Sequence, residues 1–254
     1  MSGKSSREAR REERLQAESE GGREGRRKRL LQIGSAAAFL VVAAVLVMIV
    51  LSANHSSGGD TNLEDVGLVN RQLHGIPQNG MVLGDPQAKV KLIEFGDLKC
   101  PVCKGFSEEI IPDVIDSKVR SGEAKIEFRN YTIIDRESTP AGAAAVAAGE
   151  QGLAWSFIEL FYRNQGLETS SYVTDEFLTA IARGASVPDI GKWNEARKSK
   201  LVLGLVRRTT EEAEKLGFTG TPSFAVTGPG TKGIEPLATP GSAGAIEEAI
   251  DGAR

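Results

Sequence analysis

Two cysteines, Cys100 and Cys103, are the only ones in the chain and stand three positions apart. A thiolate is the nucleophile of thiol–disulfide exchange, and a Cys-x-x-Cys pair can cycle between dithiol and disulfide. A metal site, a structural disulfide and inert buried thiols are the competing interpretations. Zinc requires four ligands, and the two histidines, His55 and His74, lie well upstream. A bridge across two residues closes too short a loop to add much stability. The pair therefore predicts redox chemistry, with no metal and no organic cofactor.

The segments on either side of the cysteines predict a strand-to-helix turn. Residues 88–96 alternate apolar and polar side chains, and the segment after the pair carries apolar residues at helical spacing. Pro101 falls at the first helical position, where a missing N–H costs no hydrogen bond, and Val102 completes the turn. A helix N-terminus stabilises a thiolate through its unpaired N–H groups. Cys100 is then the exposed attacking or attacked sulfur, and Cys103 is the less accessible resolving thiol.

Two other positions gain meaning beside this pair. Glu94 lies on the preceding strand; it is either a solvent-facing carboxylate or a partly buried acid that accepts the proton of Cys103. Thr221 and Pro222 come directly before another strand. That proline forms either an ordinary trans turn or a cis peptide, whose missing N–H and exposed preceding backbone would leave a groove for an extended substrate peptide.

The N-terminal part of the chain predicts a membrane anchor. Residues 1–29 contain ten Lys or Arg and six Asp or Glu, a composition typical of a disordered tail. Residues 33–53 contain no charge over 21 positions, which as a helix spans about 31 Å and matches a bilayer core. Basic residues 26–29 precede that run, so the positive-inside rule predicts a cytoplasmic tail and a transmembrane helix over 30–53. A cleaved signal peptide is the alternative, although its apolar region is normally shorter.

The remainder of the chain predicts one α/β domain. Residues 61–254 carry 21 basic and 27 acidic residues, so they offer no basic footprint for nucleic acid. Residues 54–74 are expected to be a linker, and residues 75–252 the folded domain. After the cysteine-led helix, in which Pro112 predicts a kink or break, the pattern gives a strand at 124–131, helices over about 139–216, strands at 223–226 and 234–237, and a closing helix at 243–253.

Four segments occur in an order that is informative when they are taken together: Val82-Leu83-Gly84-Asp85-Pro86, residues 92–103, Phe128-Arg129-Asn130-Tyr131 and residues 220–224. With them the chain resembles the DsbA-like thioredoxin-fold family. The resemblance implies a thioredoxin fold with a helical domain inserted between its second and third core strands. It also implies a cis peptide at Thr221-Pro222, opposite the cysteines, and a buried acid at Glu94. Well-known oxidases of the family carry His where this chain has Val102, which implies a less strongly oxidising pair.

These observations predict a membrane-anchored thiol–disulfide oxidoreductase. The catalytic domain is expected outside the cytoplasmic membrane, where disulfides persist. Its expected partners are exported proteins bearing thiols or disulfides and a membrane or extracytoplasmic protein that restores the redox state of the pair. The oxidising direction is favoured. The alternatives are a non-catalytic tethered binding or chaperone domain, in which Cys100 and Cys103 form a structural bridge, and a redox-sensing subunit of a membrane complex.

Overall fold

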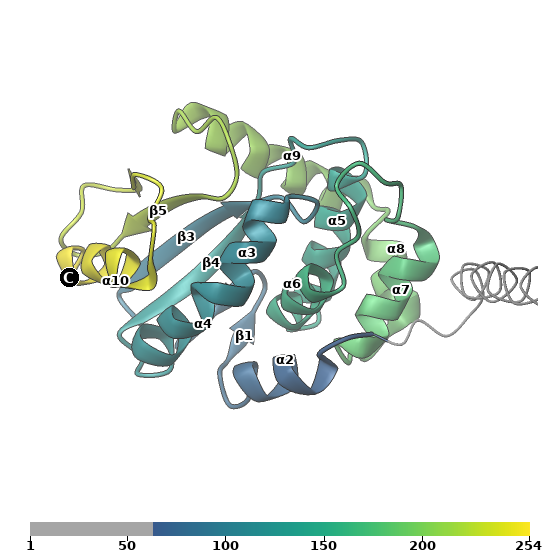
Figure 1. Ribbon diagram of the computed structural model, residues 1–254, viewed down its shortest axis with the longest axis horizontal. Helices are drawn as coiled ribbons and strands as arrows, with labels where there is room; N and C mark the ends of the chain where they lie inside the picture. The colour runs from purple at the N-terminus through teal and green to yellow at the C-terminus, as the bar shows by residue number, and fades with distance from the viewer. Residues whose placement is uncertain (1–62) are drawn as a thin grey trace, which may run out of the picture. The chain divides into compact units, whose positions relative to one another are not determined.

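The computed structural model describes residues 63–254 (Figure 1). The predicted tail, the predicted transmembrane helix at 30–53 and the first part of the predicted linker lie outside the described residues. Among the helices of residues 63–254, none is long and apolar enough to cross a membrane.

A six-stranded mixed sheet forms the centre of the described part of the chain, in the order β1-β2-β4-β3-β5-β6. The bounds are β1 Gln78–Asn79, β2 Val82–Leu83, β3 Val90–Gly96, β4 Ala124–Asn130, β5 Ser223–Thr227 and β6 Glu235–Pro236. Strand β3 pairs parallel with β4 and antiparallel with β5. Both faces of β3 are buried: Leu92 joins the large core that includes Val114 and Ile250, and Phe95 packs with Ala213. The predicted strands are confirmed, and the strand that leads to the cysteines is central.

The helix after the cysteines is interrupted as the sequence predicts. Helix α3 covers Pro101–Glu109, with Pro101 at its first position. A short helix, α4, covers Ile111–Val114, and a π-helical turn follows over Ile115–Val119. Because Pro112 has no N–H and its ring crowds the preceding turn, the hydrogen-bond ladder cannot continue from α3 into α4. The break confines α3 to the region beside the cysteines.

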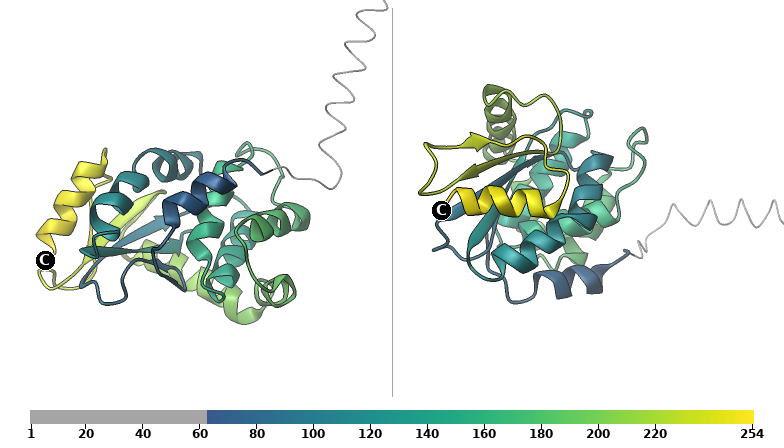
Figure 2. Two further views of the ribbon diagram at one scale, coloured as in Figure 1. Left: turned by 90° about the horizontal axis from the view of Figure 1, so that it is seen from below. Right: turned by 60° about the vertical axis from the view of Figure 1, so that its left-hand side comes forward.

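Five helices lie between β4 and β5, as the predicted helical insertion requires. They are α5 Ser138–Gly149, α6 Ala154–Arg163, α7 Asp175–Gly184, α8 Ile190–Ala196 and α9 Lys200–Lys215. Thr174 caps α7, its hydroxyl accepting a hydrogen bond from the Phe177 N–H. Helices α7 and α8 lie at one end of this part of the molecule and the closing helix α10, Ala243–Gly252, at the other (Figures 1 and 2). Helix α6 is buried on nearly every side and contacts α3, so the insertion supplies one wall of the cysteine site.

Residues that the sequence analysis assigns to the linker include a helix, α2, at Val66–Leu73. Its Val69 and Leu73 are buried in the main core, and the helix contacts α6. The sequence predicts a linker here because Gly67 and several polar residues interrupt a short apolar pattern. The helix is stabilised by burying one narrow face against the insertion, which is a tertiary effect.

Candidate active site

The two cysteines lie at the start of α3, one turn apart, and are not bonded to each other. Cys100 occupies the N-cap position, and its sulfur accepts a hydrogen bond from the Cys103 N–H at 3.3 Å. The sequence analysis expects an exposed Cys100, but only 3% of its surface is accessible. The reason is the Thr221-Pro222 turn, because the Cys100 thiol lies 3.4 Å from the Thr221 carbonyl oxygen, to which it donates. Val102, which is 56% exposed, is the outward-facing side chain of the motif.

The surroundings of the two sulfurs push their acidities in opposite directions. Hydrogen bonds from the Cys103 thiol and from the Cys103 and Val102 N–H groups lower the pKa of Cys100 to about 6, against the opposing effect of burial. Burial and the neighbouring Cys100 raise the pKa of Cys103 well above its usual value. Cys100 is therefore the thiol that ionises near neutral pH, and Cys103 is the one that holds its proton. This is the division of roles that the helix-start argument predicts.

The peptide bond between Thr221 and Pro222 is cis, as the resemblance implies. It comes directly before β5, whose pairing with β3 brings this turn next to the cysteines. The Ser223 hydroxyl donates to the Gly220 carbonyl at 2.7 Å and closes the turn. The structure thus brings together two segments that are about 120 positions apart in the chain.

Glu94 is buried, with 2% of its surface exposed, so the solvent-facing alternative is wrong. It sits on the central strand between Phe128 and Phe224 on the neighbouring strands. Among residues 63–254, no hydrogen-bond donor reaches its Oε1 atom. Burial, the charge of Glu159 and the charge of Cys100 raise the pKa of Glu94 to about 8. A neutral carboxyl group therefore lies within electrostatic range of both cysteines.

A second buried acid, Glu159, is absent from the sequence predictions. It is 1% exposed on α6, and its Oε2 accepts a hydrogen bond from the Ser107 hydroxyl of α3 at 3.0 Å. Burial raises the pKa of Glu159 to about 7, although Ser107 and Arg163 act in the opposite direction. One signal in the sequence marks it: Glu159 is the only charged residue in the mainly apolar run 153–162.

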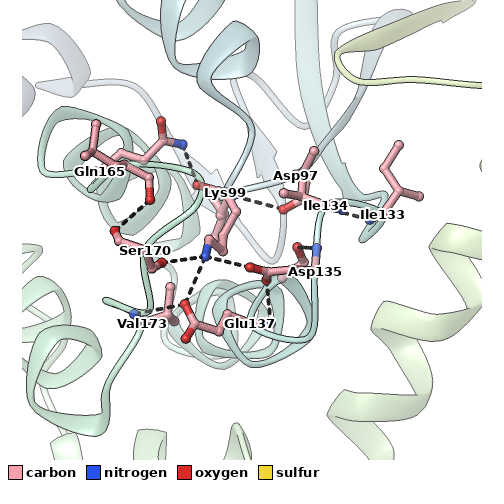
Figure 3. Close-up of polar contacts among 12 residues, drawn as sticks. Asp97, Lys99, Ile133, Ile134, Asp135, Glu137, Gln165, Ser170 and Val173 are labelled. Carbon is pink, nitrogen blue, oxygen red and sulfur yellow. Dashed lines mark hydrogen bonds and ion pairs between the residues drawn. The ribbon is translucent and has the colours of Figure 1, made fainter.

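Lys99, directly before the first cysteine, is also fully buried and was not singled out from the sequence. Its ammonium group donates to Asp135 Oδ2 at 2.7 Å, Glu137 Oε2 at 3.0 Å and the Ser170 carbonyl at 3.0 Å (Figure 3). Burial alone would lower the pKa of Lys99, but the hydrogen bonds to Asp135 and Glu137 outweigh it and raise that pKa. This ion cluster fixes the loop after β4 and the loop after α6 to the cysteine turn.

The Asp97 carboxylate also stabilises the cysteine turn by accepting backbone hydrogen bonds. Its Oδ1 accepts from the Lys99 N–H at 2.9 Å, and its Oδ2 accepts from the Ile133 and Ile134 N–H groups at 2.8 and 3.0 Å (Figure 3). Gln165 donates to the Leu98 carbonyl at 2.7 Å. The backbone that carries Cys100 is therefore tied to the loop after β4 through Asp97 and to the residues after α6 through Gln165.

Within residues 63–254, no three His, Cys, Asp or Glu side chains are grouped so that they could hold a metal ion. The chemistry that the described site offers is that of two thiols with different acidities beside a protonated carboxyl group.

Comparison with known proteins agrees with this geometry. The thioredoxin family profile matches residues 77–247. The chain belongs to the thioredoxin family. Its relatives include the probable disulfide bond formation protein D of Bacillus anthracis, 31% identical over 58% of this chain and 69% of that protein. The disulfide bond formation protein D of Bacillus subtilis strain 168 is 26% identical over 57% and 66% of the two chains.

Solved structures show the same fold. The crystal structure of oxidised BdbD from Bacillus subtilis superimposes with a TM-score of 0.60, covering 69% of this chain and 95% of that one at 23% identity. These relatives place this thioredoxin-family chain in the DsbA-like group. The resemblance to that group and the inserted helical domain are confirmed. The protein is a protein disulfide oxidoreductase.

Proposed function

We propose that this enzyme works as an oxidase, donating a Cys100–Cys103 disulfide to the thiols of exported proteins. The observation that carries the direction is the stabilised Cys100 thiolate, whose pKa is lowered to about 6 by hydrogen bonds from Cys103. A fold that stabilises the reduced thiolate makes the corresponding disulfide more oxidising. Val102 stands where well-known oxidases of the group carry His, so the pair is expected to be less strongly oxidising than theirs.

The proposed reaction proceeds in two exchanges. A substrate thiolate attacks the Cys100 sulfur, the Cys100–Cys103 bond breaks, and Cys103 leaves as a thiolate that takes a proton from Glu94. A second substrate thiolate then attacks the substrate sulfur of the mixed disulfide, and Cys100 leaves as its stabilised thiolate. The substrate gains a disulfide, and the enzyme becomes a dithiol. This scheme uses no metal and no organic cofactor.

Thr221 and Pro222 are proposed to bind the substrate backbone. Pro222 has no N–H to pair, and the Thr221 carbonyl is 3.4 Å from the Cys100 sulfur, so an extended peptide that reaches this sulfur passes beside the turn. Pro101 and Val102 are exposed and shape the rim that such a peptide meets. A membrane or extracytoplasmic redox partner would return the dithiol to the disulfide.

The reduction potential of the pair tests the direction. The full-length protein is equilibrated with glutathione buffers and the dithiol fraction is measured by alkylation, with Cys100→Ser as the control that must show no redox transition. We expect a potential between about −120 mV, the value of DsbA, and about −180 mV, the value of protein disulfide isomerase. A value of about −270 mV, that of thioredoxin, would instead indicate a reductase. A reagent-resistant bridge below about −300 mV would favour the non-catalytic alternative.

Mixed disulfides provide a second test of the same proposal. In Cys103→Ala the Cys100 thiol has no resolving partner, so cells that produce this variant should accumulate covalent complexes with exported proteins on non-reducing gels. The matched control is Cys100→Ser, which should form none. Only uncomplexed protein in Cys103→Ala would contradict the proposed exchange.

We further propose that residues 30–53 anchor the enzyme in the cell membrane, with the N-terminus in the cytoplasm and the catalytic domain outside. The 21-residue uncharged run and the basic residues 26–29 support this orientation. Protease added to intact spheroplasts should remove the catalytic domain, while an epitope at the N-terminus is degraded only after lysis. Protection of the catalytic domain in intact spheroplasts would refute this topology.

A further inference from the structure

Glu94 and Glu159 bring two carboxyl groups into one buried region from different parts of the chain. Glu94 comes from the central strand β3 and Glu159 from helix α6 of the insertion, and each is at most 2% exposed. The charge of Glu159 acts on Glu94. Two carboxylates that interact without solvent cannot both ionise readily, so such a pair holds at least one proton at neutral pH.

The hydrogen bonds decide which of the two carboxyl groups holds that proton. Glu159 accepts from the Ser107 hydroxyl at 3.0 Å, and this donor stabilises its anion. The Oε1 atom of Glu94 has no donor among residues 63–254, so its neutral form is the favoured one. The charge of the pair therefore belongs on Glu159 and the proton on Glu94, on the side of the cysteines.

The other groups that act on the pair come from α6, α3 and α2, and Lys104 of α3 is paired with Glu108 at 2.6 Å. Arg163 of α6 favours the Glu159 anion, while Glu108 of α3 opposes it; uncharged Gln72 of α2 also favours it. The Tyr162 hydroxyl donates to the Asp97 carbonyl at 3.2 Å. Burial, together with the charges of Cys103 and Glu94, raises the pKa of Tyr162 well above its usual value, so it stays neutral. Besides Glu159, the groups that act on the Glu94 side are the two cysteines themselves.

We propose that Glu159 is a positioning residue of the exchange reaction, which keeps a proton on Glu94 for delivery to Cys103. When a substrate thiolate opens the disulfide, the bonding electron pair leaves on Cys103. The Glu94 carboxyl proton then moves to that sulfur, which leaves Glu94 ionised beside the Glu159 anion. Repulsion between the two carboxylates favours the return of a proton from solvent to Glu94 and so resets the site. The inference rests on the role proposed above for Glu94.

The pH dependence of reduction tests this proposal. The oxidised full-length protein is mixed with excess glutathione between about pH 5 and pH 10, and each rate is divided by the thiolate fraction of glutathione. In the wild type the corrected rate should fall as Glu94 loses its proton. In Glu159→Gln the amide can still accept from Ser107, but the charge is gone. The midpoint of the fall should therefore move down by about one pH unit.

Two further variants separate this proposal from the one on which it rests. Glu94→Gln should remove the alkaline fall, and adding Glu159→Gln to it should then change nothing more. Glu109 is an exposed acid of α3, the helix that begins at the cysteines, and Glu109→Gln should keep the wild-type midpoint. A fall that Glu94→Gln removes but Glu159→Gln leaves in place would overturn the role of Glu159 alone. A fall that survives in Glu94→Gln would overturn the role of Glu94 and this inference with it.

Infrared difference spectra give a readout that a merely structural role would not change. The spectra are best taken at about pH 8, where Glu159, with a pKa of about 7, is mostly ionised and Glu94, with a pKa of about 8, still holds much of its proton. The wild type should then show the absorption of a protonated carboxyl group that is mostly lost in Glu94→Gln. Glu159→Gln should also reduce it, because the Glu94 pKa falls when the neighbouring charge is removed. If Glu159→Gln does not fold, Ser107→Ala serves in its place. Removing that donor shifts the proton toward Glu159, so the midpoint should move in the same direction by a smaller amount. An unchanged carboxyl band and midpoint in Ser107→Ala would overturn the proposal.

Discussion

Two buried ionisable clusters flank the cysteine turn, and they treat charge in opposite ways. The Lys99 ammonium has three N–H donors and three acceptors within 3.0 Å. Glu94 is equally covered, yet its Oε1 atom has no donor among the described residues. The pKa is raised in both groups, which keeps Lys99 charged and Glu94 neutral.

The difference teaches that burial by itself does not decide what an ionisable side chain does. A buried charge with all its hydrogen bonds made keeps its charge and ties segments together. A buried acid without a donor keeps its proton and is able to transfer it. The first cluster holds the geometry of the site, and the second holds a proton for it.

The largest expected effect is on stability, and it tests whether Lys99 is structural. Lys99→Met leaves Asp135 and Glu137 without their cation, which should lower the free energy of unfolding by about 3 kcal/mol. That is the low end for a broken buried ion pair, because both acids are partly exposed. Urea unfolding measures it, with the exposed Lys192→Met as the matched control. Equal stability of the two variants would mean that the Lys99 ion pairs contribute nothing.

The second-largest expected effect is the difference in reactivity between the two cysteines. At pH 7 about 90% of a thiol with a pKa near 6 is ionised, against about 3% of an ordinary cysteine. Iodoacetamide should therefore label Cys100 with a midpoint near pH 6, while Cys103 stays unlabelled over the same range. Mass spectrometry of each cysteine in the reduced full-length protein measures both. A shared midpoint near pH 8.5, approximately, would erase the contrast.

The third prediction concerns the pH dependence of stability. The pKa of Glu94 rises from 4.5 to about 8 on folding, so between these values the folded state holds a proton that the unfolded chain has lost. The contribution of the Glu94 carboxyl group to the free energy of unfolding is complete below about pH 4.5. It is lost as the pH rises toward 8, by up to about 1.4 kcal/mol per pH unit.

Between pH 6 and pH 7 the free energy of unfolding should therefore fall by about 1.4 kcal/mol less in Glu94→Gln than in the wild type. Urea unfolding at the two pH values measures this difference, and Glu109→Gln should behave as the wild type does. Parallel losses in Glu94→Gln and the wild type would show that Glu94 is ionised in the folded protein.

The smallest effect belongs to the hydrogen bond that joins α3 to α6. Ser107→Ala removes the donor to Glu159 and should lower the free energy of unfolding by about 1 kcal/mol at pH 8. Because the pKa of Glu159 is about 7, the effect should be smaller at pH 6, where the carboxyl group is neutral. Ser121→Ala, which removes an exposed hydroxyl, is the control. A loss of stability that does not depend on pH would mean that the strength of the Ser107 hydrogen bond does not depend on the charge of Glu159.

Local patterns were enough to predict the scaffold of the site. The alternation before Cys100 and the proline after it predict a strand that runs into a helix, since both signals depend on neighbouring residues only. The turn at Thr221-Pro222 and the helical insertion were predicted in the same way, with the resemblance adding their arrangement. The accessibility of Cys100 was not, because the segment that covers it comes from about 120 positions later in the chain.

The sequence by itself determined which residues can do redox chemistry, since Cys-x-x-Cys spacing and a helix start are local properties. Only the tertiary structure decided the electrostatics around them. Nothing in the sequence distinguishes Lys99 from a surface charge until the Ser170 carbonyl accepts its hydrogen bond in the folded chain. The apolar run around Glu159 marks that residue, but only the packing of α6 against α3 places it on the Ser107 hydroxyl. Desolvation depends on which distant segments exclude water, and that is why the two buried clusters emerge only when the chain is folded.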